Sequence, residues 1–382
     1  MAFNSKQVPP AIVVCANSQA KKQIGLFANA FNLGSRIMNP SSKQIIESYY
    51  LETEERLFFA VKGAEHPSDR IIAVLRYAPD PEKGDRKKED TVYRRLYHFA
   101  EQAEFLKASY PQYLAFDPVF QTTLQSVPRS RIRRIYNPCI RLRELLQTPF
   151  RKTIEEDAVA FCRLLQGEAG IPWDDMGITG SLLIGLHAEI SDLDITIFGM
   201  RSCKKVYQAL LRILNTASNA ALCRLDDRGI DDLYVQRVAD TPMDFQAFKN
   251  LEMRKVNQGS FRSRPYFVRF VKQAYKESES YGHTHYTPIG RAAITALIAD
   301  DREAIFTPCK YRLSDVQKLE GPAMPNPGEI VSFRGRFCEQ ACVGECVMAV
   351  GTMERVRDEQ GKVRHRLLLG NSPEDTMIPW RK

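Results

Sequence analysis

The stretch that decides the fold reads Gly177-Ile-Thr-Gly-Ser-Leu-Leu-Ile-Gly-Leu-His-Ala-Glu-Ile-Ser-Asp-Leu-Asp-Ile-Thr-Ile-Phe-Gly199. A glycine-serine turn at Gly180 and Ser181 is predicted to open a short apolar helix, and a strand follows it. Asp192 and Asp194 stand two positions apart in that strand. Because side chains alternate across a strand, the two carboxylates share one face. We therefore expect an apolar face packed into a core and a pair of acids at the start of the strand.

The chemistry of this stretch suits a metal ion and a phosphate. Two carboxylates so close repel each other unless they share a proton or bind a cation. Their hard oxygens suit Mg²⁺, which typically takes one or two carboxylates together with substrate phosphates. Gly180 has no Cβ and lets a backbone approach closely. Ser181 is predicted to cap the helix, where free N–H groups favour an anion.

This stretch resembles the signature of the polymerase-beta-like nucleotidyltransferase superfamily, which consists of Gly-Ser, a short helix and Asp-x-Asp on the second strand. Gly180, Ser181, Asp192 and Asp194 fill those positions, and Ser191 matches the serine that often precedes the acid pair. More widely, the chain is similar to prokaryotic nucleotidyltransferase-domain proteins of undefined substrate. The segments that carry this wider resemblance are Arg70–Asp80, Phe116–Phe120, Glu168–Trp173, Tyr266–Lys272 and Ile330–Gln340.

The resemblance implies an enzyme that transfers a nucleotidyl group from an NTP such as ATP to an acceptor hydroxyl and releases pyrophosphate. Asp192 and Asp194 would bind two Mg²⁺ ions, with Mn²⁺ as the alternative metal. Gly180, Ser181 and Ser191 would bind the nucleotide.

Enzymes of this superfamily generally use a third carboxylate, on a later strand, to activate the attacking hydroxyl. An acid is expected shortly before Arg269, yet Phe267 stands there. Asp300 and Asp301, at the end of an expected strand, are the nearest candidates for the third carboxylate, and Asp244 is another; of these we take Asp300. If none fills the role, a site that binds nucleotide without turnover is the alternative.

The bulk composition is that of a soluble globular protein of more than one domain. The chain has 382 residues, of which 44% are hydrophobic and 26% charged, and a formal net charge of +8. That length favours two or three domains. No run of about eighteen apolar residues is present, so no membrane span is expected. Nine cysteines, an odd number, favour reduced thiols and a cytoplasmic location.

Four regions are expected along the chain. Residues 1–46 form a basic tail, which is disordered or, as the alternative, an organellar transit peptide, because no Asp or Glu precedes Glu47. The other regions are an N-terminal α+β accessory module at 47–150, an α/β (α+β) nucleotidyltransferase core with a mixed sheet at 151–288, and a β-rich C-terminal module at 289–382.

Apolar periodicity predicts the main elements of these regions. Helices are expected at Tyr93–Tyr110, Thr153–Gln166 and Cys203–Leu214. Strands are expected at Leu57–Val61, Ile71–Leu75 and Tyr266–Val271. The last third carries strands at Ala292–Ile298, Ile305–Leu313, Ile330–Phe337, Cys346–Val356 and Val363–Leu369, which favour a small barrel or sandwich, with an oligonucleotide-binding barrel as one form.

Basic side chains beside aromatic ones suggest an RNA partner. The arginines concerned are Arg131, Arg133, Arg134, Arg264 and Arg269. Guanidiniums and aromatic rings are what nucleic-acid backbones and unstacked bases contact. The alternative is structural: the first three would lie on a solvated face, and the last two on the outward face of an edge strand.

Two further clusters are weaker signals. Cys338, Cys342 and Cys346 recur every four residues and, with His365 as a fourth ligand, would make a zinc site; small buried side chains are the alternative. His283 and His285 are expected in a surface loop.

Two other classes of function stay open beside RNA nucleotidyl transfer. One is a non-catalytic nucleotide- or RNA-binding protein that retains the fold. The other is a nucleotidyltransferase that modifies a small molecule or a protein. The oligomeric state is not predicted.

Overall fold

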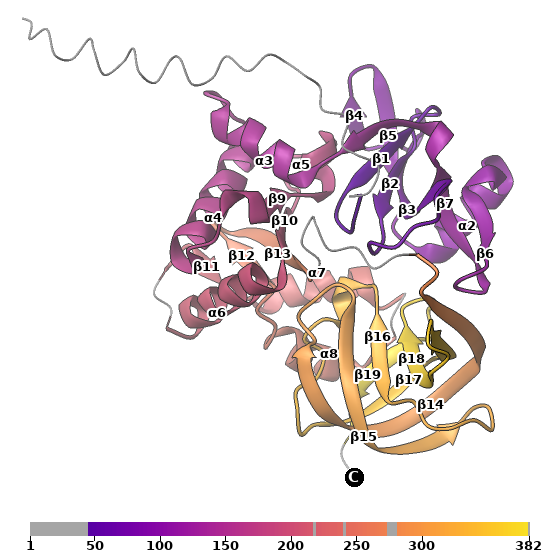
Figure 1. Cartoon of the computed structure of the whole chain (residues 1–382). Coiled ribbons are helices and arrows are strands. Elements are labelled where there is room, and N and C mark those ends of the chain that lie inside the picture. Colours follow the sequence, from indigo (N-terminus) through magenta and orange to yellow (C-terminus); the bar gives the residue numbers. More distant parts are fainter. Residues whose placement is uncertain (1–44, 217–218, 240–241, 273–280, 381–382) are drawn as a thin grey trace, which may run out of the picture. The chain divides into compact units, whose positions relative to one another are not determined.

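The computed structural model describes residues 45–216, 219–239, 242–272 and 281–380 (Figure 1). These residues form a mixed α+β fold with three sheets. Almost all of the expected basic tail lies outside the described residues. Ile45 and Ile46 are the exceptions, and both are buried in the core of the first module.

The N-terminal module is built on an eight-stranded sheet. Its strands are β1 (Tyr50–Thr53), β2 (Phe58–Val61), β3 (Arg70–Pro79), β4 (Arg86–Lys88), β5 (Thr91–Arg95), β6 (Leu114–Asp117), β7 (Thr122–Pro128) and β8 (Ile132–Tyr136). The main path runs β4-β5-β3-β2-β1-β8, and β7 pairs with both β3 and β6. Strands β2 and β3 confirm the two strands predicted here.

The helix predicted at Tyr93–Tyr110 is only partly correct. The chain forms strand β5 up to Arg95, and α2 runs from Phe99 to Ser109. Tyr93 is fully buried and pairs across to Pro79 of β3. Tertiary pairing thus overrides a helical apolar pattern, as is common for short segments.

The second module surrounds a five-stranded sheet in the order β11-β12-β13-β10-β9. Its elements are α3 (Pro138–Gln147), α4 (Thr153–Ala169), β9 (Met176–Ile178), α5 (Gly180–Ile184), β10 (Leu193–Phe198), α6 (Met200–Thr216), β11 (Leu222–Cys223), α7 (Asp227–Arg237), α8 (Phe245–Glu252), β12 (Gln258–Phe261) and β13 (Arg264–Val271). Helices α4 and α6 pack on each other and on β10. Strands β10 and β13 are parallel, and the other pairs are antiparallel, so the sheet is mixed.

Most predictions for this module are confirmed. Helices α4 and α6 and strands β10 and β13 lie where apolar periodicity placed them. Strand β13 lies between β12 and β10, so it is not the edge strand that would leave its arginines facing outward.

The C-terminal module is a closed barrel. Its strands are β14 (Thr284–Glu303), β15 (Cys309–Glu320), β16 (Glu329–Ser332), β17 (Cys346–Asp358), β18 (Val363–Leu369) and β19 (Thr376–Pro379). The order β14-β15-β16-β18-β17 closes on itself because β17 also pairs with β14 (Figure 1). Strand β19 pairs with the first part of β17, on the edge where β18 pairs with the later part. Of the two predicted forms, barrel and sandwich, the structure has the barrel, and β17 and β18 form an antiparallel hairpin within it.

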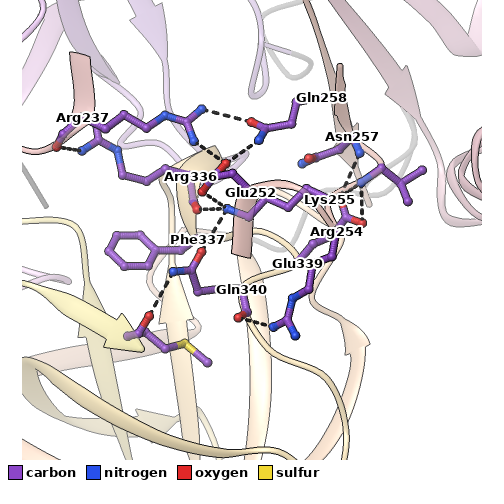
Figure 2. Close-up of polar contacts among 12 residues, drawn as sticks. Arg237, Glu252, Arg254, Lys255, Asn257, Gln258, Arg336, Phe337, Glu339 and Gln340 are labelled. Atoms are coloured by element: carbon purple, nitrogen blue, oxygen red, sulfur yellow. Dashed lines mark hydrogen bonds and ion pairs between the residues drawn. The ribbon is translucent and has the colours of Figure 1, made fainter. Parts of the chain in front are cut away.

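A buried polar cluster joins the barrel to the second module (Figure 2). The Lys255 ammonium is 2% exposed and donates to Glu252 at 2.8 Å and to Gln340 at 2.9 Å. It also donates to the carbonyl of Arg336 at 2.7 Å. We call Glu252, Lys255, Arg237, Gln258 and Gln340 the junction cluster. It fixes the connection between β16 and β17, including the short helix η4 (Gly335–Phe337), against α8 and β12.

Within the part of the chain that the structure describes, no helix is both long and apolar enough to cross a membrane.

Candidate active site

The two carboxylates lie at the start of β10, as the alternation predicts. Asp192 directly precedes the strand and Asp194 is its second residue. Leu193, Ile195 and Ile197 on the opposite face are all fully buried in the core of the second module. The apolar half of the strand therefore anchors the acid pair in the sheet.

The glycine-serine turn lies directly against this pair. Gly180 has φ +63°, in the left-handed region, and a Cβ built on it would overlap the Oδ2 atom of Asp194. The Thr179 amide donates to the Asp194 carbonyl at 2.9 Å. Position 180 thus needs glycine for two reasons, its backbone angle and its contact with the carboxylate.

The environment of Asp194 favours its neutral form. Burial raises the pKa of its carboxyl to about 7, with a further upward contribution from the charge of Asp192. Arg269, Arg95 and Arg76 lower the pKa without cancelling those effects. This is the repulsion between close carboxylates that a bound cation would relieve.

The two serines of the motif have different surroundings. The helix cap at the start of α5 is Thr179 rather than Ser181, so the prediction that Ser181 caps the helix is wrong. The Ser181 hydroxyl is buried without a hydrogen-bond partner among the described residues. Ser191 accepts a hydrogen bond from the Ala188 amide at 2.9 Å, which shapes the loop that delivers Asp192.

The N-terminal module is fastened to this turn through Ser48. The Ser48 carbonyl accepts from the Thr179 hydroxyl at 2.6 Å, and the Ser48 hydroxyl donates to Thr196 at 3.0 Å. Thr196 is fully buried two positions after Asp194. The module that the sequence suggested as an accessory therefore forms part of the site.

A cavity of about 1430 Å³ opens beside the carboxylates. Thr179, Gly180, Ser191, Asp192 and Asp194 line it, together with residues of the N-terminal module and of the barrel. The lining carries both signs of charge, with acids such as Glu47, Glu303 and Glu354 beside the cations. Among its arginines are Arg76 and Arg95 from the first module, Arg237 and Arg269 from the second, and Arg334 and Arg336 from the β16–β17 connection.

Sequence reasoning missed most of this cationic lining. Arg76 lies in the Arg70–Asp80 segment, and Arg334 and Arg336 lie in Ile330–Gln340, two of the segments that carry the wider resemblance. That overlap is a signal that could have found them. Arg95 is marked only by a short run of arginine and aromatic residues.

Tyr97 stands among these arginines. The guanidinium of Arg95 lies 5.2 Å from the centre of the Tyr97 ring and that of Arg76 lies 5.5 Å from it. Burial raises the pKa of the phenol, but the surrounding guanidiniums outweigh that effect and lower it; they are Arg237, Arg336, Arg76 and Arg95. The region around Tyr97 therefore stabilises negative charge.

The structure does not bring the predicted third carboxylate to the pair. Asp300 lies on β14, accepts from the Arg302 guanidinium at 2.6 Å, and is not part of the cavity lining. Asp244 caps α8 by accepting from the amides of Gln246 and Ala247, and it is likewise outside the lining. The residue opposite Asp194 on β13 is Phe267.

The arginines proposed to contact RNA mostly have acidic or aromatic partners within the chain. Arg131 and Arg133 lie 3.4 and 3.8 Å from Glu55 and Glu52 respectively. Arg134 lies over the Tyr136 ring at 4.7 Å. Arg264 pairs with Asp157 and Glu189, and Arg269 lies 3.4 Å from Glu47. Of these five, Arg269 lines the cavity.

The cysteines and histidines noted in the sequence do not gather into a site. Cys338 is buried, Cys342 exposed and Cys346 partly exposed. His283 lies 3.5 Å from Glu359. Over the described residues, no group of three or more His, Cys, Asp or Glu side chains is arranged to hold a metal ion.

The donor set of Asp192 and Asp194 nevertheless fits Mg²⁺ that is completed by substrate. Two hard carboxylates, one with its pKa raised beside the other, match an ion that keeps several ligand positions for phosphate and water. The same set would not form a closed site for zinc, which takes four protein ligands.

Comparisons with known proteins give one relative without a described activity. The chain is 29% identical over 333 residues to the uncharacterized protein MJ1086 of Methanocaldococcus jannaschii, covering 85% of this chain and 95% of that protein. No family model matches the chain. No solved structure matches it. The similarity thus extends well beyond the carboxylate stretch but brings no function with it.

Proposed function

We propose that the chain is a metal-dependent nucleotidyltransferase that transfers a nucleotidyl group from an NTP to an acceptor hydroxyl. The five-stranded sheet with α5 would be its nucleotidyltransferase core. The observation that carries the proposal is the contact between Gly180 and Asp194, which sets a glycine-serine turn against paired carboxylates at the wall of a large cavity that several arginines also line.

The roles of the residues follow from their positions. Asp192 and Asp194 would hold two Mg²⁺ ions, or Mn²⁺, which supply charge neutralisation for the transferring phosphoryl group. Gly180 lets phosphate oxygens approach the backbone, and Arg269 adds a positive charge beside Asp194. The acceptor oxygen bonds to the α-phosphorus, the bond to pyrophosphate breaks, and the acceptor proton leaves. Because Phe267 lies opposite Asp194, we assign no general base to β13.

A binding protein that retains this fold is the rival from another class. Such a protein has no need for two unneutralised acids beside its ligand, since a carboxylate pair repels phosphate. The raised pKa of Asp194 is a cost that a pure anion-binding site would avoid. This observation favours the enzyme over the binder.

The test is a transfer assay on the full chain with Mg²⁺, each labelled NTP in turn, and either total RNA or pools of small-molecule acceptors. Asp192→Asn combined with Asp194→Asn should reduce transfer by on the order of a hundredfold or more, because the metal contribution is worth several kcal/mol. Asp174→Asn is the matched control, since Asp174 is exposed and pairs with Arg143 on the surface.

The results separate the candidate functions. Transfer that disappears in the double variant and persists in the control supports the enzyme. Turnover with small molecules or proteins and none with RNA identifies the other acceptor class. RNA binding of equal strength in both proteins, with no transfer by either, would establish the binding protein instead.

A further inference from the structure

The cavity has more room than a single nucleotide needs. Its volume of about 1430 Å³ exceeds the roughly 300–1,000 Å³ of ordinary small-molecule pockets. Its lining has two chemically different parts. One contains Gly180 and the carboxylates of Asp192 and Asp194, and the other contains Tyr97 and the guanidiniums around it.

Arg76 and Arg95 are the key residues of this second part. Both guanidiniums lie within about 5.5 Å of the centre of the Tyr97 ring, and neither forms an ion pair with a carboxylate of the described residues. Arg94, the neighbour of Arg95, behaves differently because it pairs with Asp80 at 3.0 Å and with Glu101 at 2.7 Å. Within one strand, Arg94 is neutralised by two carboxylates of the chain, whereas Arg95, the more exposed of the two, lines the cavity without such a partner.

The other two modules contribute two more guanidiniums that act on Tyr97, those of Arg237 and Arg336. Arg336 donates to the Arg237 carbonyl at 3.4 Å, and both residues line the cavity. Arg237 is held in place by Glu252 and Gln258 of the junction cluster. The charge of Arg237 is therefore already compensated by Glu252, whereas Arg76 and Arg95 repel each other unless an anion binds between them.

The carboxylate pair does not supply that anion. Arg95 and Arg76 act on Asp194 only over a distance, since no ion pair joins them. Once Asp192 and Asp194 ligate metal, their charge is compensated there, and Arg76 and Arg95 need another anionic partner.

A phosphate suits this position better than a nucleobase. The Tyr97 ring is already in contact with two guanidiniums, which leaves it a poor platform for stacking a base. Guanidiniums bind phosphate oxygens through two parallel hydrogen bonds, and those of Arg76 and Arg95, both beside the Tyr97 ring, match the two charges of a phosphate dianion.

We propose that the arginines around Tyr97 bind a phosphate monoester group of the second substrate, separate from the triphosphate of the NTP. The acceptor of the nucleotidyl group is then itself phosphorylated, either as a small phosphate ester or at an RNA terminus. This inference rests on the proposed function in so far as it calls the second substrate an acceptor. Phosphate binding at the site can be measured without turnover.

The experiment measures the Kd of inorganic phosphate by calorimetry, without metal or nucleotide, on the full chain carrying Asp192→Asn and Asp194→Asn. Arg76→Gln and Arg95→Gln, each in that background, should weaken binding about tenfold or more, as expected for a lost charge-assisted bond. Arg94→Gln is the matched control and should leave the Kd within about twofold, because its charge is already paired. Thermal melting of every variant checks that the fold is intact.

Two further binding measurements identify which ligand occupies the phosphate site. In the unsubstituted protein, a non-hydrolysable ATP analogue with Mg²⁺ should leave phosphate binding unchanged. Displacement by glycerol 3-phosphate identifies a small phosphate ester, and displacement only by 5′-phosphorylated RNA, with 5′-hydroxyl RNA inert, identifies an RNA terminus. Phosphate binding that is equal in Arg76→Gln, Arg95→Gln and Arg94→Gln overturns the proposal, and so does displacement by the ATP analogue.

These outcomes keep the two proposals distinguishable. If no NTP supports transfer while Arg76→Gln and Arg95→Gln still weaken phosphate binding, the proposed function fails and the phosphate site stands. If transfer occurs and the KM for the acceptor is the same in Arg95→Gln and Arg94→Gln, the phosphate site fails and the proposed function stands.

Discussion

Two acidic regions of the second module have opposite electrostatics. Asp194 lies beside Asp192 at the cavity, and burial together with its neighbour raises its pKa to about 7. Glu252 lies in the junction cluster, where burial also raises the pKa but Lys255 and Arg237 outweigh that effect and lower it. Glu252 is buried and has cations in direct contact, whereas Asp194 is partly exposed at the cavity and forms no ion pair with a cation of the described residues.

This difference distinguishes a candidate ligand-binding site, at the carboxylate pair, from a structural contact between modules, at the junction cluster. In the junction cluster every partner is supplied by the chain, so the cluster holds the β16–β17 connection against α8 (Figure 2). At the carboxylate pair, the neutralising partner is not supplied by the chain. Buried polar groups that the chain satisfies serve stability, and those it leaves unsatisfied serve a ligand.

The largest effect on stability is expected from Lys255→Met. The substitution leaves Glu252 buried without its closest cation, and breaking a buried pair costs about 3–5 kcal/mol. Urea unfolding should show the loss in the free energy of unfolding. The matched control is Lys249→Met, since Lys249 pairs with the exposed Asp227 and should cost less than about 1 kcal/mol. Equal losses of unfolding free energy in the two variants would mean that the junction cluster contributes no more to stability than a surface ion pair.

Gly180→Ala should have the next largest effect, and it acts on the site. A side chain there must adopt a left-handed backbone and displace the Asp194 carboxylate, at a cost of about 1–3 kcal/mol. Nucleotide transfer should fall together with stability. Gly167→Ala is the control, because a Cβ at Gly167 meets nothing within 4 Å and lies in helix α4, where alanine is favourable. Gly180→Ala with unchanged stability and transfer would remove the contact on which the proposed function depends.

Asp194→Asn should change stability in the opposite direction to Lys255→Met. Removing one of two adjacent charges relieves repulsion, and we expect a gain of about 1 kcal/mol in the free energy of unfolding, measured in EDTA. Transfer activity should be lost in the same protein. A variant that is both less stable and inactive would mean that Asp194 stabilises the fold, as Glu252 does in the junction cluster.

The sequence predicted the acid pair and its strand because alternation and charge are local properties. The sequence marked Gly180 as a place for close backbone approach but did not predict its contact with Asp194, and it named Ser181 as the cap where Thr179 is the residue in that position. The barrel was predictable as a class from spaced strands, and its closure through β14 and β17 was not, since pairing partners are far apart in the chain.

The cationic part of the site could not be predicted in the same way. Arg76, Arg95, Arg237 and Arg336 come from four separate elements, and only the folded chain brings them to Tyr97. Asp300 shows the converse problem. Its position near the end of an apolar strand pattern suggested a catalytic acid, yet that strand belongs to the barrel and its carboxylate pairs with Arg302.

The smallest effect is expected at the rim of the junction, from Glu345→Gln. Glu345 accepts from Arg254 at 2.6 Å, and its side chain is 36% exposed, so the pair contributes about 0.2–1 kcal/mol. Burial raises the pKa of Glu345, but Arg254 outweighs that effect and lowers it below the ordinary value of 4.5. The stabilisation is therefore complete above about pH 5 and declines as the pH falls below about 4.5, where the unfolded chain binds the proton more readily. Urea unfolding at several pH values should show the free energies of unfolding of wild type and Glu345→Gln becoming equal in acid. A difference that persists unchanged there would mean that packing, rather than charge, stabilises the contact between Arg254 and Glu345.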